Sequence, residues 1–192
     1  MISDEDLERA EAYALIGRLF AAPPDDGVLE MLGELEGDDS PLGRAVAALA
    51  VASRDTNAAD AGGEFSDLFV GLTTREEVSP YGAVQTTGSM FGEALLKVRA
   101  DLGEMGIGKA EDVSETEDHI ALLCQVMTGL LRRELGTDVT PEKTGAFFKA
   151  HIAPWAPKFA KAVEATESAR FYSAVARFSR LFWESETIRY DR

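Results

Sequence analysis

The segment 114–119 holds the densest set of chemically capable side chains in this sequence. It reads Ser-Glu-Thr-Glu-Asp-His, so three carboxylates and an imidazole lie within five residues. Glu115 and His119 are four residues apart and would share one face of a helix. Such a set could ligate a metal ion or form an acid–base pair. One hypothesis is therefore a helical metal-binding protein or metalloenzyme. Its functional residues would be Glu115, Asp118, His119 and His151.

A structural interpretation competes at the same segment. Ser114 and Glu117 match the capping box Ser-x-x-Glu, and acids in a first turn are favoured by the helix dipole. We therefore predict that Ser114 is the N-cap of a long helix over residues 115–135. Capping leaves His119 unexplained, because a cation at a helix N-terminus is unfavourable. The segment lacks a second histidine at ligand spacing, so we predict no metal ligands.

Other catalytic patterns are incomplete. Residues 103–110 nearly match the phosphate-binding pattern G-x-x-x-x-G-K-[ST], but Ala110 replaces the hydroxyl residue and no strand precedes the stretch. A glycine-rich helix end explains it without a ligand. Cys124 has mostly apolar neighbours in the sequence, and no G-x-S-x-G elbow is present, so neither a cysteine nor a serine nucleophile is indicated. His151 and Trp155, four apart, fit a core helix. We predict no catalytic residues and no enzyme.

The surrounding periodicity is helical almost throughout. The expected helices cover about residues 3–22, 29–35, 40–49, 64–72, 88–102, 115–135, 140–155 and 168–185, with a bend at Pro154 and Pro157. Segment 55–63 is predicted to be a connection, and 73–85 an ordered loop. Phe91 is expected to face inward with Leu95. The pattern predicts an all-α fold of roughly nine helices in one domain over residues 1–192, without strands.

The charge is strongly acidic. The chain has 34 acids against 19 lysines and arginines, a formal net charge of -15. Such a surface repels phosphate backbones, so nucleic acid is excluded as a partner, whereas a basic ligand would be attracted. The single cysteine fits a reducing compartment. The acidic start is no export signal and no run is long enough to span a membrane. We therefore expect a cytoplasmic protein.

Four motifs, in order, resemble the TorD/DmsD family of cytoplasmic molybdoenzyme chaperones. They are Glu64 to Gly71 with Leu68-Phe69, the loop Ser79-Pro80-Tyr81-Gly82, the segment Glu115 to His119, and Phe147 with His151 and Trp155. Phe171-Tyr172 matches the aromatic pair of the family's last helix. The similarity covers roughly residues 60–185. Thr116 stands where the family has proline, Ala83 where serine is common and Gln85 where an aromatic is usual.

The resemblance implies a TorD-like helical fold that binds the twin-arginine signal peptide, or the body, of a molybdenum or tungsten oxidoreductase precursor. It also implies maturation before export or cofactor insertion. The middle of the chain is most similar to members associated with formate dehydrogenase. Family members have been linked to weak guanine-nucleotide binding; no other cofactor is implied. Monomer and dimer both remain open.

The same resemblance indicates which residues would contact the peptide. A twin-arginine leader has a cationic stretch followed by an apolar one, and carboxylates can hold guanidinium groups in bidentate pairs. The arginines would contact Glu115 and Asp118, while His119 would orient a carboxylate or bind the peptide backbone. The remaining predicted peptide-binding residues are Phe69, Pro80, Tyr81 and Leu123. Replacing Asp118 and His119 by alanine is expected to weaken binding without loss of helix.

Overall fold

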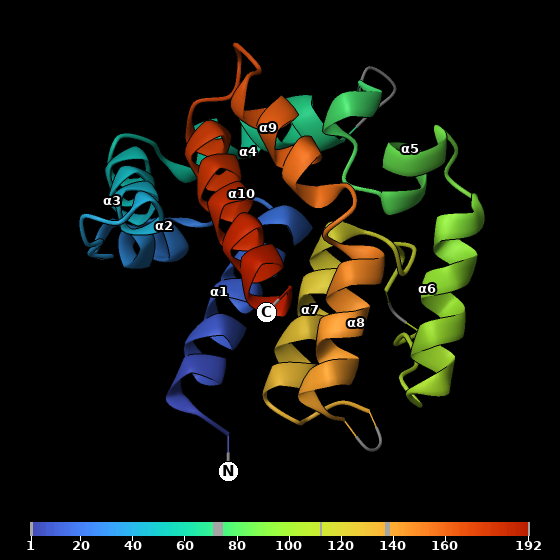
Figure 1. Ribbon diagram of the computed structural model, residues 1–192. Coiled ribbons are helices and arrows are strands. Elements are labelled where there is room, and N and C mark those ends of the chain that lie inside the picture. Colours follow the sequence, from blue (N-terminus) through green and yellow to red (C-terminus); the bar gives the residue numbers. More distant parts are fainter. Residues whose placement is uncertain (1, 71–74, 112, 137–138, 192) are drawn as a thin grey trace. The chain divides into compact units, whose positions relative to one another are not determined.

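The computed structural model describes residues 2–70, 75–111, 113–136 and 139–191 (Figure 1). Within these ranges the chain forms ten α-helices and one 3-10 helix, with no strand of a sheet. The all-α prediction is therefore confirmed. The helices are α1 (Asp4–Ala21), α2 (Asp26–Gly33), α3 (Pro41–Arg54), α4 (Ala58–Phe69), η1 (Glu76–Val78), α5 (Gly82–Thr87), α6 (Glu93–Glu104), α7 (Ile120–Leu131), α8 (Pro141–His151), α9 (Ala156–Glu164) and α10 (Phe171–Tyr190). None of these helices is long and apolar enough to cross a membrane.

Contacts within the chain divide it into two compact units. The first comprises Met1–Ala21, Pro80–Trp155 and Tyr190–Arg192, and the second Ala22–Ser79 and Ala156–Arg189. The first unit thus holds α1 and α5 to α8. The second holds α2 to α4, η1, α9 and all but the last residue of α10. Each unit is assembled from segments distant in sequence, and the single domain over residues 1–192 stays a prediction.

The first unit is built on the pairing of α1 with α7, which lie side by side in Figure 1. The buried face of α1 includes Tyr13 and Ile16, and that of α7 includes Met127. The two helices approach closely at Gly17, where a Cβ atom would lie 3.2 Å from Cys124 Cβ. A larger residue at Gly17 would force the helices apart.

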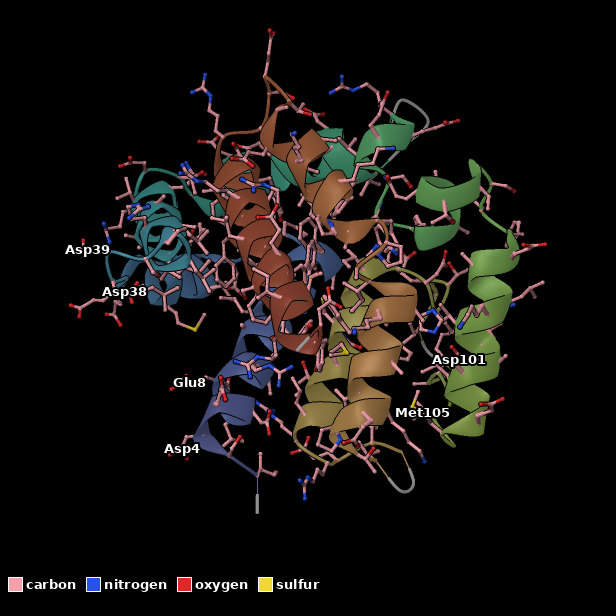
Figure 2. The ribbon with its side chains drawn as sticks, viewed as in Figure 1. Asp4, Glu8, Asp38, Asp39, Asp101 and Met105 are labelled. Carbon is pink, nitrogen blue, oxygen red and sulfur yellow. The ribbon has the colours of Figure 1, made fainter. Side chains whose placement is uncertain are left out.

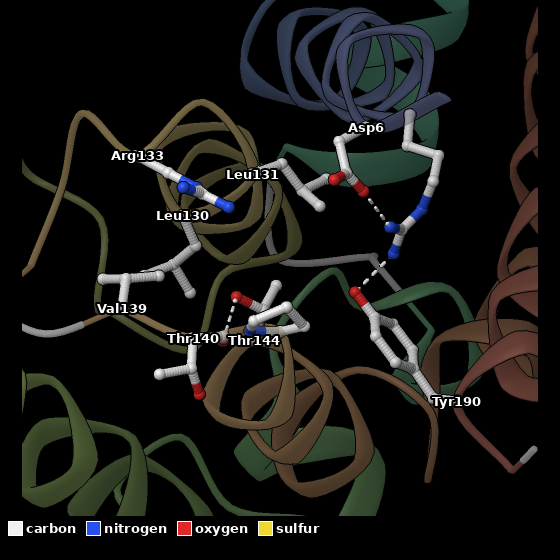
Figure 3. A pocket seen from close by; sticks show the side chains of 10 residues that line it. Asp6, Leu130, Leu131, Arg133, Val139, Thr140, Thr144 and Tyr190 are labelled. Carbon is white, nitrogen blue, oxygen red and sulfur yellow. Dashed lines mark hydrogen bonds and ion pairs between the residues drawn. The ribbon is translucent and has the colours of Figure 1, made fainter. Parts of the chain in front are cut away.

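The last residue of α10 belongs to the first unit and packs beside α1 and α8. The Arg9 guanidinium donates to Asp6 over 2.8 Å and to the Tyr190 hydroxyl; Asp6 and Tyr190 are labelled in Figure 3. The adjoining hollow has a volume of only about 40 Å³. Since one bound water needs at least ~10–15 Å³, this hollow has room for only a few water molecules and not for a large peptide side chain.

The second unit has an aromatic cluster that joins α4, α9 and α10. The ring centroid of Phe69 lies 5.4 Å from Phe65, 6.3 Å from Phe159 and 5.2 Å from Tyr172. The Glu64 carboxylate accepts three hydrogen bonds of 3.0 Å from the backbone N–H groups of residues 170–172, where α10 begins. The acidic-aromatic motif of α4 therefore anchors the start of α10.

Two helix starts lie where the sequence predicted them. Ser40 is the N-cap of α3 and accepts from the Gly43 N–H, with Pro41 as the first helical residue. Thr140 caps α8 in the same way, ahead of Pro141. In both caps the hydroxyl oxygen accepts from a backbone N–H three residues later, so rules based on neighbouring residues can locate them.

Other predicted boundaries are wrong. Segment 55–63 is largely the start of α4, because Asn57 provides an N-cap that accepts from the Asp60 N–H. The predicted loop 73–85 contains η1 and the start of α5. Phe91 is 77% exposed rather than buried, since α5 ends at Thr87 with Gly88 as a left-handed C-cap, and α6 begins only at Glu93. The motif residue Gly71 lies outside the described residues.

Candidate functional site

Two loops of the first unit meet where the sequence predicted a binding site. Tyr81 and His119 form an isolated antiparallel bridge. The Ile120 N–H donates to the Pro80 carbonyl over 2.8 Å, and the Gly82 N–H donates to the Asp118 carbonyl over 3.0 Å. Two of the four motifs, more than thirty residues apart in the sequence, are thereby joined by main-chain hydrogen bonds.

The Asp118 carboxylate is part of this junction rather than a free surface group. The residue is only 1% exposed. Its Oδ2 accepts from the Ala83 N–H over 2.7 Å, and its Oδ1 accepts from the Thr116 hydroxyl over 2.6 Å. Tyr81, the N-cap of α5, makes no side-chain cap of its own. Asp118 therefore caps α5 from a different segment of the chain.

The predicted capping box at Ser114 is wrong. α7 begins at Ile120, and its N-cap is His119, whose Nδ1 accepts from the Ala121 N–H over 3.1 Å. Glu117 instead forms an ion pair of 2.9 Å with Arg99 of α6. The bridge to Tyr81 holds residue 119 in an extended conformation, which prevents the helix from starting earlier.

His119 is held neutral by its surroundings. An Nδ1 that accepts a backbone hydrogen bond carries no proton, so the ring proton lies on Nε2. Burial lowers the pKa of His119, although Glu115 and Asp118 oppose the shift. A cation would be unfavourable at the N-terminus of α7. A neutral imidazole that accepts a hydrogen bond is not, and this explains the position of His119.

Tyr81 and Glu115 form a side-chain pair beside the bridge. Both are half-buried, and the Tyr81 hydroxyl donates to Oε2 of Glu115. The Tyr81 ring packs edge-on against His119 with centroids 4.9 Å apart. Burial, followed by the hydrogen bond to Glu115, raises the pKa of the Tyr81 phenol above its ordinary range. The Lys109 ammonium donates to the Glu115 backbone carbonyl over 2.8 Å, which fixes the loop.

The other predicted contact residues lie in different surroundings. Pro80 is buried at the bridge. Leu123 is fully buried in α7, so a peptide could not reach it in this conformation. Phe69 belongs to the second unit and packs in its aromatic cluster. The peptide contacts of all three stay predictions.

The residues of the metal hypothesis do not converge. In the part of the chain that the structure describes, no group of three or more His, Cys, Asp or Glu side chains is arranged to hold a metal ion. Glu115 binds Tyr81, and Asp118 binds the start of α5. His151 instead contacts Asp101 of α6, with 2.7 Å between Nε2 and Oδ2. This arrangement does not support a shared metal site.

Three hollows of the first unit offer space for a ligand. The most apolar has a volume of about 220 Å³ and has the Lys109 and Glu117 side chains at its edge. Its apolar lining is Leu102, Ile107, Val113, Leu122, Val126 and Leu135. Two others, of about 440 and 470 Å³, lie along α6 and α8. Asp101 of α6 and Met105, the residue that follows α6, are labelled in Figure 2, and both line the larger one.

The apolar hollow was missed by sequence reasoning. Ile107 and Val113 lie in the irregular segment between α6 and α7, where no periodicity marks an inward face. The only available signal was the glycine-rich stretch after α6, which was interpreted as a turn. A turn that carries isolated apolar residues can line a hollow, and here it does.

The two histidines should make the protein less stable in mild acid. The pKa values of His119 and His151 are both lowered by burial. Between the unfolded value of about 6.5 and the lower folded values the unfolded chain binds more protons, so stability falls as pH drops below about 6.5. We expect urea midpoints to fall between pH 7 and pH 5, and the fall to be smaller in His119→Asn with His151→Gln. An unchanged slope in that double variant would contradict the assignment.

Comparison with known proteins adds a further finding. The model of the family described as nitrate reductase delta subunit matches residues 35–161, more than half of the chain. A Vibrio cholerae protein named Chaperone protein TorD is 27% identical over 130 residues, which cover 64% of this chain and 59% of that relative. Proteins of the same name from Shewanella loihica and Shewanella pealeana are 25% and 22% identical. Their matches cover 93% and 96% of this chain, and 79% and 90% of the relatives.

Proposed function

The chain belongs to the family described as nitrate reductase delta subunit, and on that premise we propose that it is a maturation chaperone for a molybdenum or tungsten oxidoreductase precursor. The name of its relatives, Chaperone protein TorD, confirms the predicted TorD/DmsD resemblance and a family without enzymatic activity. The chain spans 59% of the length of the Vibrio cholerae relatives, so its client and its activity as a whole protein are part of the proposal.

The observation that carries the proposal is the bridge between Tyr81 and His119. It brings together, in one unit, two motifs that the resemblance assigns to peptide binding. Beside it lie the half-buried Glu115 carboxylate and, across Lys109, the apolar hollow of about 220 Å³. A leader with arginines followed by an apolar stretch has matching chemistry: guanidinium groups for the carboxylate and an apolar side chain for the hollow.

The geometry divides the predicted residues by role. Glu115 is the carboxylate that we assign to an arginine, because its side chain is half-buried and, among the residues that the structure describes, it accepts its hydrogen bond from the Tyr81 phenol. The Asp118 carboxylate accepts from the Ala83 N–H of α5 and from the Thr116 hydroxyl, and His119 Nδ1 accepts from the backbone of α7, so we assign both residues to the shape of the site. The hollow replaces the buried Leu123 as the proposed apolar contact.

A calorimetric titration tests this proposal. The probe is a synthetic leader with Ser-Arg-Arg ahead of an apolar stretch, alongside its Lys-Lys variant. We expect saturable binding of the Arg-Arg leader and weaker binding of the Lys-Lys variant, because lysine cannot form the bidentate pair. Glu115→Gln should weaken binding of the Arg-Arg leader by roughly tenfold, which corresponds to the loss of one charge-assisted contact.

The matched control is Glu8→Gln. Glu8 is an exposed acid of α1 in the same unit, labelled in Figure 2, and its replacement changes the net charge by the same amount. It should leave the affinity nearly unchanged. Equal losses in both variants would mean that only the overall charge matters. No binding to any leader would count against the proposal as a whole.

Several finer points belong to the same proposal. The twin-arginine leader is proposed as the ligand, with the body of the precursor as a second contact, and formate dehydrogenase as the client. A cytoplasmic location follows from that role. Weak guanine-nucleotide binding stays a prediction, as do the monomeric and dimeric alternatives.

A further inference from the structure

The charges at the edge of the apolar hollow do not cancel one another. Lys109 and Glu117 both line this hollow of about 220 Å³. Glu117 is paired with Arg99 over 2.9 Å, so these two charges compensate each other. The Lys109 ammonium instead donates to the Glu115 backbone carbonyl, a neutral group, over 2.8 Å. Among these groups, one positive charge is therefore left at the edge of the hollow.

The same loop carries the opposite charge at the Glu115 carboxylate. That carboxylate accepts from the Tyr81 phenol, which burial keeps neutral by raising its pKa. The negative charge lies at Tyr81, while the Lys109 charge lies at the hollow. The proposed site is thus negative where an arginine would bind and positive where an apolar side chain would enter.

We propose that Lys109 determines specificity at this site, because it repels a basic side chain from the hollow while it admits an apolar one. The inference rests on the proposed function and concerns the ligand of the same site. The chain has a formal net charge of -15, which attracts basic peptides in general. A positive charge at the hollow selects among them, because two cations close together repel each other.

The selected ligand is a segment in which the basic residues end where the apolar stretch begins. Such a segment places its arginine at Glu115 and an apolar side chain beside Lys109. A segment that is basic throughout, or one that is shifted along the site, brings a second cation to Lys109 and is rejected. Lys109 thereby fixes both the class of peptide and its register on the protein.

The experiment uses calorimetry with leaders that are changed at one position. Each of the first three positions after the arginine pair is replaced in turn by lysine or by glutamate, and weakly bound forms are measured by competition with the unchanged Arg-Arg leader. Both replacements introduce a charge, so the loss of apolar contact is similar. The dissociation constant of the lysine form divided by that of the glutamate form therefore reports the sign of the charge at the hollow.

Lys109→Glu should lower this ratio by roughly tenfold at one or more of the positions, because repulsion of the lysine form becomes attraction. Lys109→Gln removes the charge and should lower the ratio by about threefold, and it provides the comparison if Lys109→Glu does not fold. A merely structural role of Lys109, which holds the Glu115 backbone, would weaken both forms alike and leave the ratio unchanged.

The matched control is Lys158→Glu, an exposed lysine of α9 in the second unit that does not line the hollow. It alters the net charge by the same amount as Lys109→Glu and should change the ratio by less than about twofold. An unchanged ratio in Lys109→Glu at every position, or an equal fall in Lys158→Glu, overturns the proposal; binding of the unchanged leader then leaves the proposed function intact. If the wild type binds no leader, the proposed function fails together with this inference.

Discussion

Asp118→Ala is expected to lower the free energy of unfolding by about 3 kcal/mol, because it leaves a buried backbone N–H without its acceptor and removes a second, charge-assisted bond. The residue is 1% exposed, and its two oxygens accept from Ala83 and Thr116. The loss includes the cap of α5 and the junction that supports the bridge. Urea denaturation followed by circular dichroism measures the effect.

Asp118→Asn is the matched control. The amide oxygen can still accept from the Ala83 N–H, while the amide nitrogen can donate to the Thr116 hydroxyl, so we expect a loss of only ~1 kcal/mol. A large loss of stability in Asp118→Ala differs from the expectation from the sequence, in which loss of the Asp118 carboxylate weakens peptide binding and leaves the fold intact. If Asp118→Ala denatures like the wild type but no longer binds the leader, Asp118 contacts the peptide directly.

Glu64→Ala is expected to have the next largest effect, a loss of about 2–3 kcal/mol, because one carboxylate satisfies three backbone N–H groups at a helix N-terminus. These donors belong to residues 170–172, at the start of α10. The carboxylate also lies at the positive end of the helix dipole. The measurement is the same urea denaturation.

Glu64→Gln keeps one acceptor oxygen and should lose about half as much stability. Asp67→Ala, which removes an exposed acid from the same helix, should change stability by less than ~0.5 kcal/mol. Equal stability of Glu64→Ala and the wild type would show that solvent replaces the carboxylate at no cost. The acid of the α4 motif would then need another explanation, such as a client contact.

Asp118 and Glu64 show that an acid in one of these motifs can have a structural role rather than a role in peptide binding. Each is an acid in a segment that resembles the family, and each caps a helix formed by a different part of the chain. Glu115, by contrast, binds a side chain rather than a backbone group. A test of peptide recognition should therefore begin with Glu115 and Tyr81.

Local sequence rules located two helix starts at which the interacting atoms are close in the chain. Ser40 and Thr140 cap the helices that were predicted to begin there, and each is a hydroxyl residue ahead of proline. The capping-box rule failed at Ser114, because the competing partner is a main-chain segment more than thirty residues away. A capping box stabilises by about as much as one or two tertiary hydrogen bonds, so it can be overridden.

The sequence by itself determined the all-α class, through its periodicity, and the chemistry available at residues 114–119. Periodicity is a property of neighbouring residues and survives any arrangement of the helices. Only the tertiary structure decided the role of each acid. Burial and the position of distant N–H groups assign Asp118 to α5, while a phenol from the other loop binds Glu115. Roles that depend on partners far along the chain cannot be read from spacing, because spacing does not say which loops meet.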